Sequence, residues 1–242
     1  MHRFYTDKID CENNKAYITG DDVKHMKKVL RLSEGEKVVV CDYKNKDYIC
    51  EIFAFLEGKA ELNILEIKEN FSEPLIDVTI YQSLPKSDKM ELVIQKCVEI
   101  GVKKFVPVAS KRSVVKLNDD KKKIVRWQRI ADEAAKQCGR GIKVEVSDVL
   151  SFKEAIKSVG DDTLKLIPYE NEKELSIKTV LKESKHKKIA VFIGPEGGFS
   201  GEEVEFALAN GFSAVTLGPR ILRCETAPIA VATVCMYEKG DW

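Results

Sequence analysis

Ile193-Gly194-Pro195-Glu196-Gly197-Gly198 is the first of two glycine-bearing stretches that decide the fold. The second is Leu217-Gly218-Pro219-Arg220-Ile221-Leu222-Arg223-Cys224-Glu225-Thr226-Ala227. Each follows a short apolar run typical of a buried strand, residues 189–193 and 214–217, and each precedes a helix-start signal. In open α/β sheets, ligands bind where loops leave the carboxyl ends of strands. Glycine lets backbone approach a ligand and proline holds the loop's shape, so the two stretches predict one small-molecule pocket.

Neither stretch fits the common nucleotide-binding patterns. Gly-x-Gly-x-x-Gly is absent from the chain, and no Gly-Lys-Ser/Thr follows either stretch to grip phosphates. They offer instead backbone amides and carbonyls, Glu196, and the Arg-x-Glu-Thr of residues 223–226. A ligand recognised in this way carries hydrogen-bonding edges rather than a triphosphate. The alternative is that both are turns whose glycines only relieve backbone strain.

Strands and helices alternate from Leu75 onward, which indicates a largely parallel α/β sheet with covering helices. One helix is expected from Asp88, with Glu91 three residues later and an end at Gly101. A second stops at Gly139, a third starts at Ser200 with Glu203 three residues on, and a last starts near Thr226. The expected strands are Val78–Leu84, Phe105–Ala109, Val144–Ser147, Thr163–Ile167, Lys188–Ile193 and Ala214–Leu217.

The last predicted helix differs from the others because residues 229–236 are apolar almost all round. A helix without a polar face is buried on several sides, either in the core or at a subunit interface. Pro228 suits its first turn, and Thr226 is expected to cap it.

Residues 1–72 are β-rich instead and have the size of a small barrel. Val38–Asp42 and Tyr48–Phe53 predict a hairpin, and Ala60–Ile67 adds a strand. One short helix is expected over Asp21–Leu30, with Val23, Met26, Val29 and Leu30 on its apolar side. Glu73 before Pro74 disfavours helix and marks the boundary.

Composition is that of a globular protein of one or two domains, with 242 residues of which 44% are hydrophobic and 33% charged. No apolar run approaches the roughly 18 residues of a membrane span, and the N-terminus lacks a signal-peptide core. The seven cysteines form no Cys-x-x-Cys pair and only three histidines occur, so no metal site is expected. We therefore expect reduced thiols, a cytoplasmic location and no membrane partner.

The net charge of +1 hides an uneven distribution. Residues 103–143 carry thirteen Lys or Arg against four Asp or Glu, a local charge of +9, while a smaller basic cluster lies at residues 24–31. Because binding to phosphates depends on nearby cations, these segments favour a nucleic-acid partner. Solvated helix faces are the alternative explanation, above all for Lys121–Lys123.

Gly194–Ser200 followed by Leu217–Ala227 resembles the ribosomal RNA small subunit methyltransferase E family, of the SPOUT class of S-adenosylmethionine-dependent RNA methyltransferases. The second stretch is the most specific, and the resemblance covers nearly the whole chain. Cys138 and Cys224 depart from the family pattern. The other matching segments are Met1–Tyr5, His25–Arg31, Lys86–Val102, Lys111–Val114 and Gln137–Arg140.

The resemblance implies an α/β fold in which residues 75–242 form the SPOUT methyltransferase domain, with a parallel sheet and a trefoil knot. It implies that residues 1–72 form a β-rich PUA-like RNA-binding domain. S-adenosylmethionine is the implied cofactor, ribosomal RNA of the small subunit the implied partner, and N3 of a uridine in 16S RNA the implied target. A homodimer through the C-terminal domain is implied as well.

Site residues follow from the two loops and the charge distribution together with this resemblance. Catalytic or target-orienting roles fall to Arg223, Glu225 and Glu196, and Tyr169 and Glu170 are further candidates for the pocket wall. The residues expected to bind the cofactor are Ile193, Gly194, Pro195, Glu196, Gly197, Gly198, Leu217, Gly218, Ile221, Leu222, Thr226 and Ala227. Those expected to bind RNA are Arg3, Lys24, Lys27, Lys28, Arg31, Arg112 and Arg140.

Several alternatives stay open at the level of sequence. Arg223 could instead be ion-paired to Glu196 or Glu225. The enzyme could methylate another base or a ribose of ribosomal or transfer RNA. A non-enzymatic RNA-binding or ribosome-assembly protein would explain the basic segments but not the two loops, and a dinucleotide-dependent oxidoreductase lacks its glycine fingerprint.

Overall fold

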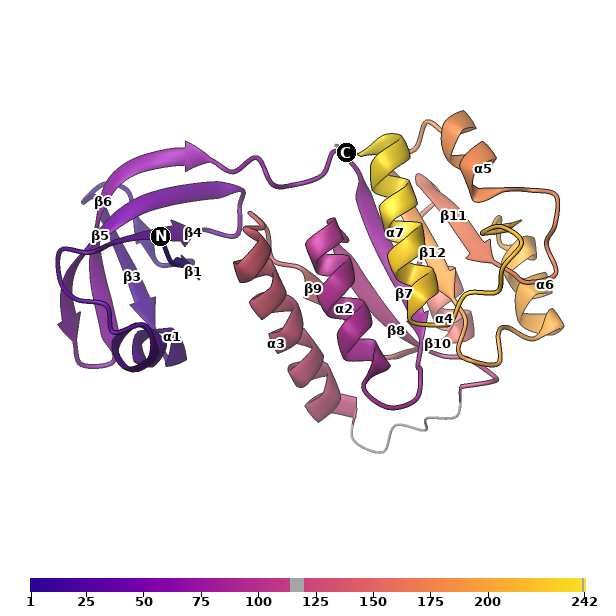
Figure 1. The fold of residues 1–242 in the computed structure, drawn as a ribbon, viewed down its shortest axis with the longest axis horizontal. Coiled ribbons are helices and arrows are strands. Elements are labelled where there is room, and N and C mark those ends of the chain that lie inside the picture. The colour runs from indigo at the N-terminus through magenta and orange to yellow at the C-terminus, as the bar shows by residue number, and fades with distance from the viewer. Residues whose placement is uncertain (114–119, 241) are drawn as a thin grey trace. The chain divides into compact units, whose positions relative to one another are not determined.

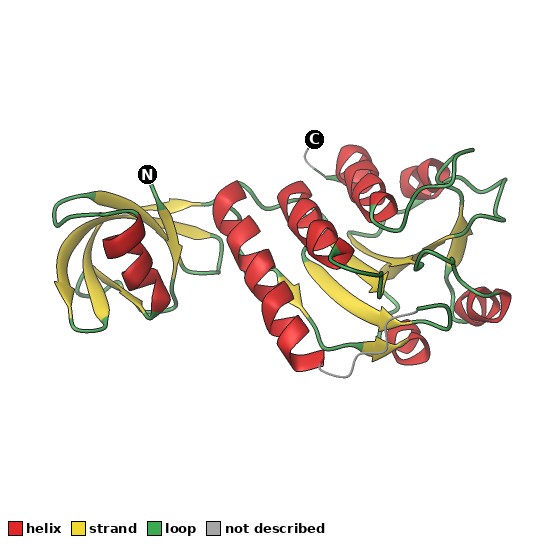
Figure 2. Ribbon diagram, turned by 60° about the horizontal axis from the view of Figure 1, so that its bottom comes forward, coloured by secondary structure: helices red, strands yellow, loops and turns green. Residues whose placement is uncertain are grey.

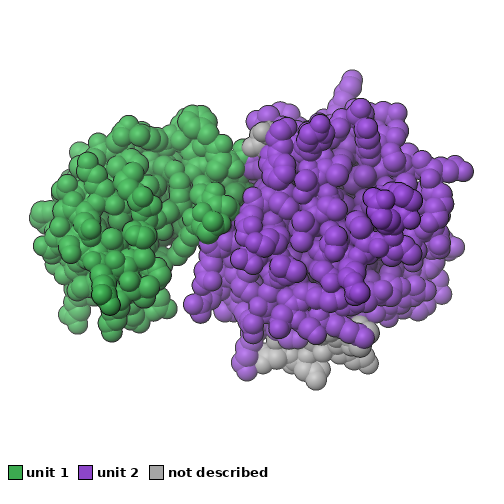
Figure 3. All heavy atoms as spheres, viewed as in Figure 1, with its two compact units in different colours: residues 1–73, 135–143 green, residues 74–134, 144–242 purple. Residues whose placement is uncertain are grey.

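The computed structural model describes residues 1–113, 120–240 and 242. The chain divides into two units (Figure 3): unit 1 is Met1–Glu73 with Ala135–Lys143, and unit 2 is Pro74–Ala134 with Val144–Trp242. The division after Glu73 falls where the sequence suggests a break. The sequence did not predict that residues 135–143 belong to unit 1.

Unit 1 is built on one curled six-stranded sheet in the order β1-β4-β5-β6-β3-β2 (Figures 1 and 2). Its pairs are antiparallel except for β1 with β4, and register shifts interrupt the long β5–β6 ladder near Cys50 and Ala54. Alternate residues point inward, so Tyr48, Cys50 and Ile52 of β5 are buried. The strands are β1 Arg3–Tyr5, β2 Ile9–Asp10, β3 Lys15–Thr19, β4 Lys37–Cys41, β5 Lys46–Leu56 and β6 Lys59–Glu69.

The helix of unit 1 is α1, Asp21–Lys24, which continues as a π-helical turn, η1, over His25–Val29. Val23 and Met26 pack into the core as predicted. The prediction for Val29 is wrong, because its side chain is 65% exposed. The wider π turn, in which the Leu30 amide donates to the His25 carbonyl, changes the rotation per residue after Met26.

Residues 135–143 are tied to unit 1 by hydrogen bonds to backbone carbonyls. The Tyr5 hydroxyl donates to the Ala135 carbonyl at 3.1 Å, and the Asn70 amide group donates to the Gly139 carbonyl at 3.0 Å. Ser72 Oγ donates to the same Gly139 carbonyl at 2.7 Å. These bonds add to the backbone bonds at the end of α3, where the Ala135 carbonyl also accepts from the Gly139 and Arg140 amides at 3.0 Å.

Unit 2 has a parallel sheet in the order β10-β8-β7-β12-β11-β13, with β9 pairing with β8. All its pairings are parallel, so the predicted parallel α/β architecture is confirmed. The strands are β7 Asp77–Ser83, β8 Lys104–Ala109, β9 Glu145–Val146, β10 Leu150–Ser151, β11 Thr163–Pro168, β12 Lys188–Ile193 and β13 Ser213–Val215.

Helices cover both faces of this sheet (Figure 2). Ala190 and Phe192 of β12 face the aromatic cluster that packs with α4 and α6, and Phe192 stacks on Tyr81 with ring centroids 4.3 Å apart. On the other face, α7 packs against α2, α5 and β7. The helices are α2 Lys89–Ile100, α3 Asp120–Cys138, α4 Phe152–Lys157, α5 Ile177–Glu183, α6 Gly201–Ala209 and α7 Thr226–Lys239.

The ends of these helices test the local predictions. Gly101 terminates α2 at φ 117°, and Ser200 with Glu203 forms the capping box of α6, as expected. Asp88 and Thr226 do not cap their helices. Asp88 makes no side-chain cap bond, and α7 begins at Thr226 with Glu225 at the cap position.

Candidate functional site

The two glycine-bearing stretches line one cavity of about 440 Å³ in unit 2. The first loop, residues 194–198, follows β12, and the second loop, residues 217–225, follows β13. Residues after β11, including Tyr169 and Glu170, form another wall, as the sequence suggests. A cavity of this size suits a small organic ligand, for which about 300–1,000 Å³ is typical.

Tight backbone packing shapes the first loop. The Gly198 amide donates to the Pro195 carbonyl at 2.9 Å, and Gly198 has φ 65°, a conformation that favours glycine. A Cβ on Gly198 would lie 2.8 Å from Glu170 Oε1, and one on Gly194 would lie 3.2 Å from Gly198 Cα. A side chain at Gly198 would thus meet both an unfavourable φ and the Glu170 carboxylate, and one at Gly194 would be in tight contact with the backbone of Gly198.

The second loop is held at its two ends and exposed in the middle. The Thr216 hydroxyl accepts from the Gly218 amide at 3.2 Å, where φ is 107°. At the other end, the amides of Thr226 and Ala227 both donate to the Arg223 carbonyl at 2.9 Å. Ile221 between them is 87% exposed, although it contributes to the cavity wall. The second loop thus contributes apolar residues, among them Ile221 and Leu222, to the cavity wall.

A lysine from α2 links the two loops. Lys89 Nζ lies 3.1 Å from Glu196 Oε1 of the first loop and 3.2 Å from Glu225 Oε2 of the second. The Lys86 amide also donates to Glu196 Oε1 at 3.0 Å. Lys89 is a cavity residue that the sequence reasoning missed, although its place at the start of an expected helix was visible.

These contacts keep the two carboxylates ionised. Burial acts to raise the pKa of Glu196, but the amides of Glu196 and Lys86 and the Lys89 ammonium outweigh it, so the pKa is lowered. The pKa of Glu225 is lowered in the same way against burial, by Cys224, its own amide and Lys89. Hydrogen bonds to both carboxylates raise the pKa of Lys89. Burial raises the pKa of the Cys224 thiol to about 12, so that thiol stays protonated.

Arg223 lines the cavity and is exposed. Its side chain makes no ion pair with any residue that the structure describes, so the alternative of a salt bridge to Glu196 or Glu225 is wrong there. Lys89 occupies that role. Arg220 also lies in the wall, which gives the cavity two available guanidinium groups.

Most residues predicted to bind the cofactor do come together at the cavity. Thr226 and Glu225 are not among its lining residues, whereas Ala227 is. Besides Tyr169 and Glu170, the lining residues outside the two quoted stretches are Lys89, Pro168, Lys173, Phe199 and Thr216, whereas Pro219, Arg220 and Cys224 lie within the second stretch. Thr216 and Phe199 flank the quoted stretches directly, so extending each stretch by one residue would have found both.

Arg112 is exposed and contacts the first loop, and its role in RNA binding stays a prediction. Its guanidinium donates to the Gly197 carbonyl of the first loop at 2.7 Å. The neighbouring Lys111 amide donates to Glu203 Oε1 at the start of α6, also at 2.7 Å. Arg112 therefore supports the cavity wall. Residues 114–119, part of the basic segment 103–143 and including Val114, lie outside the described residues.

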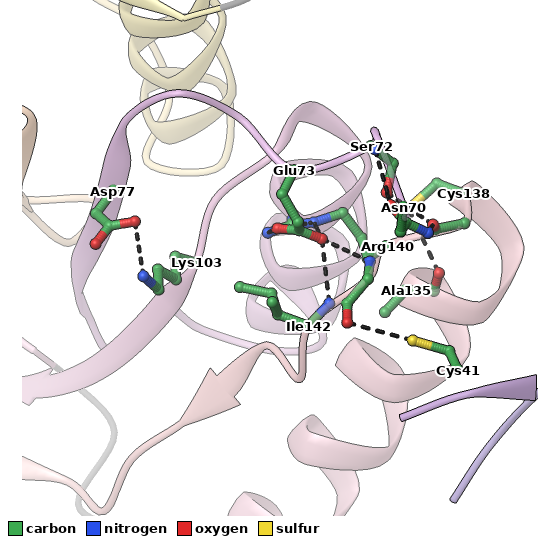
Figure 4. Close-up of polar contacts among 12 residues, drawn as sticks. Cys41, Asn70, Ser72, Glu73, Asp77, Lys103, Ala135, Cys138, Arg140 and Ile142 are labelled. Atoms are coloured by element: carbon green, nitrogen blue, oxygen red, sulfur yellow. Dashed lines mark hydrogen bonds and ion pairs between the residues drawn. The ribbon is translucent and has the colours of Figure 1, made fainter. Parts of the chain in front are cut away.

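Arg140 is not a surface cation, and the prediction that it faces RNA is wrong. It is 2% exposed, and its Nε and Nη2 contact the Glu73 carboxylate at 2.9 and 2.8 Å (Figure 4). Glu73 Oε1 also accepts from the Gly141 and Ile142 amides at 2.7 and 3.2 Å. A guanidinium so enclosed by a carboxylate is a structural group of unit 1.

The N-terminal cations divide into one paired residue and an exposed group. Arg3 makes a two-pronged ion pair with Asp47 at 2.7 and 2.6 Å. Lys24, Lys27, Lys28 and Arg31 are exposed on or beside α1 and η1. Lys24 pairs with Asp21, and Lys27 lies over the Phe55 ring at 5.1 Å. Exposed cations of this kind are suited to phosphate contacts.

Across the described ranges 1–113, 120–240 and 242, no helix is both long and apolar enough to cross a membrane. The same residues contain no cluster of three or more His, Cys, Asp or Glu arranged to hold a metal ion.

Comparison with known proteins agrees with this architecture. The family model described as an RNA methyltransferase domain matches residues 72–236, and an RNA methyltransferase PUA domain matches residues 18–64. The first covers most of unit 2, and the second confirms a PUA-like N-terminal domain. The class is therefore that of RNA methyltransferases with an appended PUA domain.

Individual relatives make the assignment more specific. Ribosomal RNA small subunit methyltransferase E from Bacillus subtilis is 36% identical over 235 residues, which cover 93% of this chain and 92% of that protein. The protein of the same name from Aquifex aeolicus is 31% identical, with 98% and 99% covered. This chain belongs to the ribosomal RNA small subunit methyltransferase E family.

Solved structures show the same fold along the whole chain. The Neisseria gonorrhoeae methyltransferase E bound to S-adenosyl methionine matches with a TM-score of 0.90 at 32% identity, covering 100% of this chain and 99% of that one. A putative methyltransferase from Legionella pneumophila, in complex with the same cofactor, gives a TM-score of 0.88 at 28% identity, with 99% and 98% covered.

Proposed function

We propose that this protein transfers the methyl group of S-adenosylmethionine to N3 of a uridine in small-subunit ribosomal RNA. The observation that carries the proposal is the cavity of about 440 Å³ formed by the first and second loops. Its backbone groups suit the hydrogen-bonding edges of an adenosyl group, and its apolar residues suit the ring faces. The Neisseria relative, similar over the whole chain, was crystallised with this cofactor.

The protein's part in such a reaction is to hold and orient. The sulfonium of the bound cofactor makes its methyl carbon electrophilic, so no covalent intermediate with the protein is needed. Ile193, Leu217 and Leu222 would contact the adenosyl group, together with loop amides and carbonyls. Holding donor and acceptor in line supplies much of the reduction in barrier.

Arg223 is the residue we assign to the developing charge on the uracil. Its guanidinium is exposed at the cavity and has no ion pair within the described chain, so it is available to a uracil oxygen. Glu196 and Glu225 have lowered pKa values and face Lys89, which makes them weak bases. We assign them an orienting role because both are engaged by Lys89, and the N3 proton leaves to bulk solvent.

RNA binding falls to cations at the surface of each unit. Lys24, Lys27, Lys28 and Arg31 are exposed in unit 1, and Lys121–Lys123, Arg126 and Arg129 of α3 are exposed in unit 2. With ribosomes as substrate, the protein would act in the cytoplasm.

We further propose that two copies associate through unit 2. Tyr237 of α7 is 72% exposed and Leu92 of the adjacent α2 is 44% exposed, which leaves apolar surface on this pair of helices. Light scattering coupled to gel filtration measures the mass in solution. A monomer at micromolar concentration would contradict this assignment.

The test of function uses small ribosomal subunits from a strain that lacks this gene. Incubation with the purified protein and methyl-labelled S-adenosylmethionine, followed by nucleoside mass analysis, should yield 3-methyluridine. A label on another nucleoside would redirect the target within the same class. Binding to subunits without methyl transfer would favour the non-enzymatic alternative.

A further inference from the structure

Lys89 is in an unusual place for a cation. It is the first residue of α2, where the helix dipole carries partial positive charge and disfavours a lysine. The ammonium is stabilised there by two carboxylates, Glu196 at 3.1 Å and Glu225 at 3.2 Å. The local sequence of α2 alone gives no reason for a lysine at this position, but the two loops do.

The two carboxylates belong to different loops. Glu196 is in the middle of the first loop and Glu225 is at the end of the second, immediately before α7. Their side chains are 31% and 19% exposed and that of Lys89 is 28% exposed, so solvent screens the cluster only in part. A single ammonium thus joins both walls of the cavity to the helix behind them.

We infer that Lys89 is a positioning residue that fixes the spacing between the first and second loops and so preorganises the cavity for S-adenosylmethionine. The identity of the ligand rests on the proposed function. The link between the loops rests on the geometry alone. Lys89 need not touch the reacting atoms to act in this way.

Charge makes this role distinguishable from simple packing. Without the ammonium, Glu196 and Glu225 would face each other as like charges, which separates the loops. The Cys224 thiol, 3.8 Å from Lys89 Nζ, is neutral and cannot compensate. The other charged residues of the wall are Glu170, Lys173, Arg220 and Arg223, and none is ion-paired with this cluster in the described structure. In a variant without the ammonium, this repulsion raises the pKa of one carboxylate, so acidification that protonates it should relieve the repulsion.

The experiment measures cofactor affinity by calorimetry in the full-length protein at pH 8 and pH 5.5. Lys89→Met should lower affinity about tenfold or more at pH 8, with a smaller deficit relative to the unmodified protein at pH 5.5. Lys89→Arg should retain most of the affinity. Lys96→Met, on the same helix and paired with nearby Glu99, is the matched control and should bind normally.

Double substitution tests the coupling. If Lys89 acts through Glu225, the affinity of Lys89→Met/Glu225→Gln should be no lower than that of Lys89→Met alone. The inference would be overturned if the two substitutions lowered cofactor affinity additively. It would also be overturned if the affinity deficit of Lys89→Met were the same at pH 8 and pH 5.5. Should Lys89→Met fail to fold, the milder Glu225→Gln replaces it as the test. This variant removes the Lys89–Glu225 ion pair and should also weaken cofactor binding.

Hydrogen exchange without cofactor separates this inference from the proposed function. Amides of residues 194–198 and 217–223 should both exchange faster in Lys89→Met than in Lys96→Met. Faster exchange with no cofactor binding by the unmodified protein would refute the proposed function and leave the link between the loops standing. Unchanged exchange in both loops would refute the link.

Discussion

Arg223 and Lys89 are both cations at the cavity, but their surroundings separate their roles. Lys89 is held between two carboxylates, which reduces its availability to a ligand. Arg223 lacks an ion pair with any described residue and keeps its five donors for other partners. At the residue scale, the partners of a side chain therefore say more about function than its charge.

Replacing Arg223 should separate binding from catalysis. We expect Arg223→Ala to keep cofactor affinity within about tenfold, or about 1.4 kcal/mol. Methyl transfer should fall by about 100-fold or more, because an interaction made with developing charge appears in turnover. Calorimetry and single-turnover kinetics check the two quantities. Loss of affinity with normal turnover would make Arg223 a cofactor-binding residue.

Replacing Arg140 should affect stability. Its side chain is 3% exposed, and Arg140→Ala would leave Glu73 partly buried without its cation. The expected loss in free energy of unfolding is about 3–5 kcal/mol. The control is Arg126→Ala, since that ion pair with Glu91 has an arginine side chain 64% exposed and contributes about 1 kcal/mol or less. Urea denaturation measures the free energy of unfolding of both variants. Equal losses of this free energy would contradict a buried structural role for Arg140.

At the element scale, the long apolar runs were predictable, whereas several of the short elements were not. Lys188–Ile193 was predicted with the observed bounds, because a central parallel strand is apolar on both faces. β2 and β10 have two residues each, too few for any period to be visible. α4 was missed although Ser151 and Glu154 form its capping box, a signal that could have found it.

The two loops that line the cavity were also predictable from local sequence. Glycine and proline mark the first and second loops in the sequence, so their meeting at one cavity follows from parallel strands ending at one edge. Lys89 and Arg112 approach these loops from residues distant in sequence, and no local pattern encodes that approach. Arg140 was wrongly predicted to lie at the surface, because a count of charges along the sequence does not reveal its ion pair with Glu73.

Replacing a glycine of the first loop tests whether the conformation of that loop is needed for cofactor binding. Gly198→Ala should strain the backbone by about 1–2 kcal/mol, since φ is 65° there, and press on Glu170. Cofactor affinity, measured by calorimetry, should fall accordingly. Gly201→Ala, at the first position of α6 with nothing within 4 Å of the added carbon, should bind normally. Normal binding by both variants would mean that the loop tolerates a different conformation.

At the scale of the whole molecule, a net charge of +1 coexists with exposed basic helix faces. With Arg140 buried and Arg112 bonded to Gly197, less of the basic segment 103–143 is available to RNA than its sequence suggests. Its exposed described cations lie mainly along α3. The trefoil knot stays a prediction.

Salt dependence measures how many of these cations meet phosphates. Replacing Lys121 and Lys123 by alanine should flatten the slope of log affinity against log salt by about 1.4–1.8, because each phosphate that is no longer neutralised changes the slope by roughly 0.7–0.9. Lys178→Ala/Lys182→Ala on α5 removes the same charge and should leave the slope unchanged. Filter binding to small-subunit RNA gives both slopes. Equal slopes in the two variants would identify the α3 face as merely solvated.

The assignment of residues 135–143 to unit 1 has a consequence for synthesis. As the chain leaves the ribosome, Met1–Glu73 emerges before unit 2, yet the groups that engage Tyr5, Asn70 and Glu73 are translated only after residues 74–134 of unit 2. The hydrogen bonds between the N-terminal segment and residues 135–143 therefore cannot form until more than sixty further residues have been synthesised. Because synthesis proceeds from the N-terminus, unit 1 can complete its fold only after part of unit 2 has been synthesised.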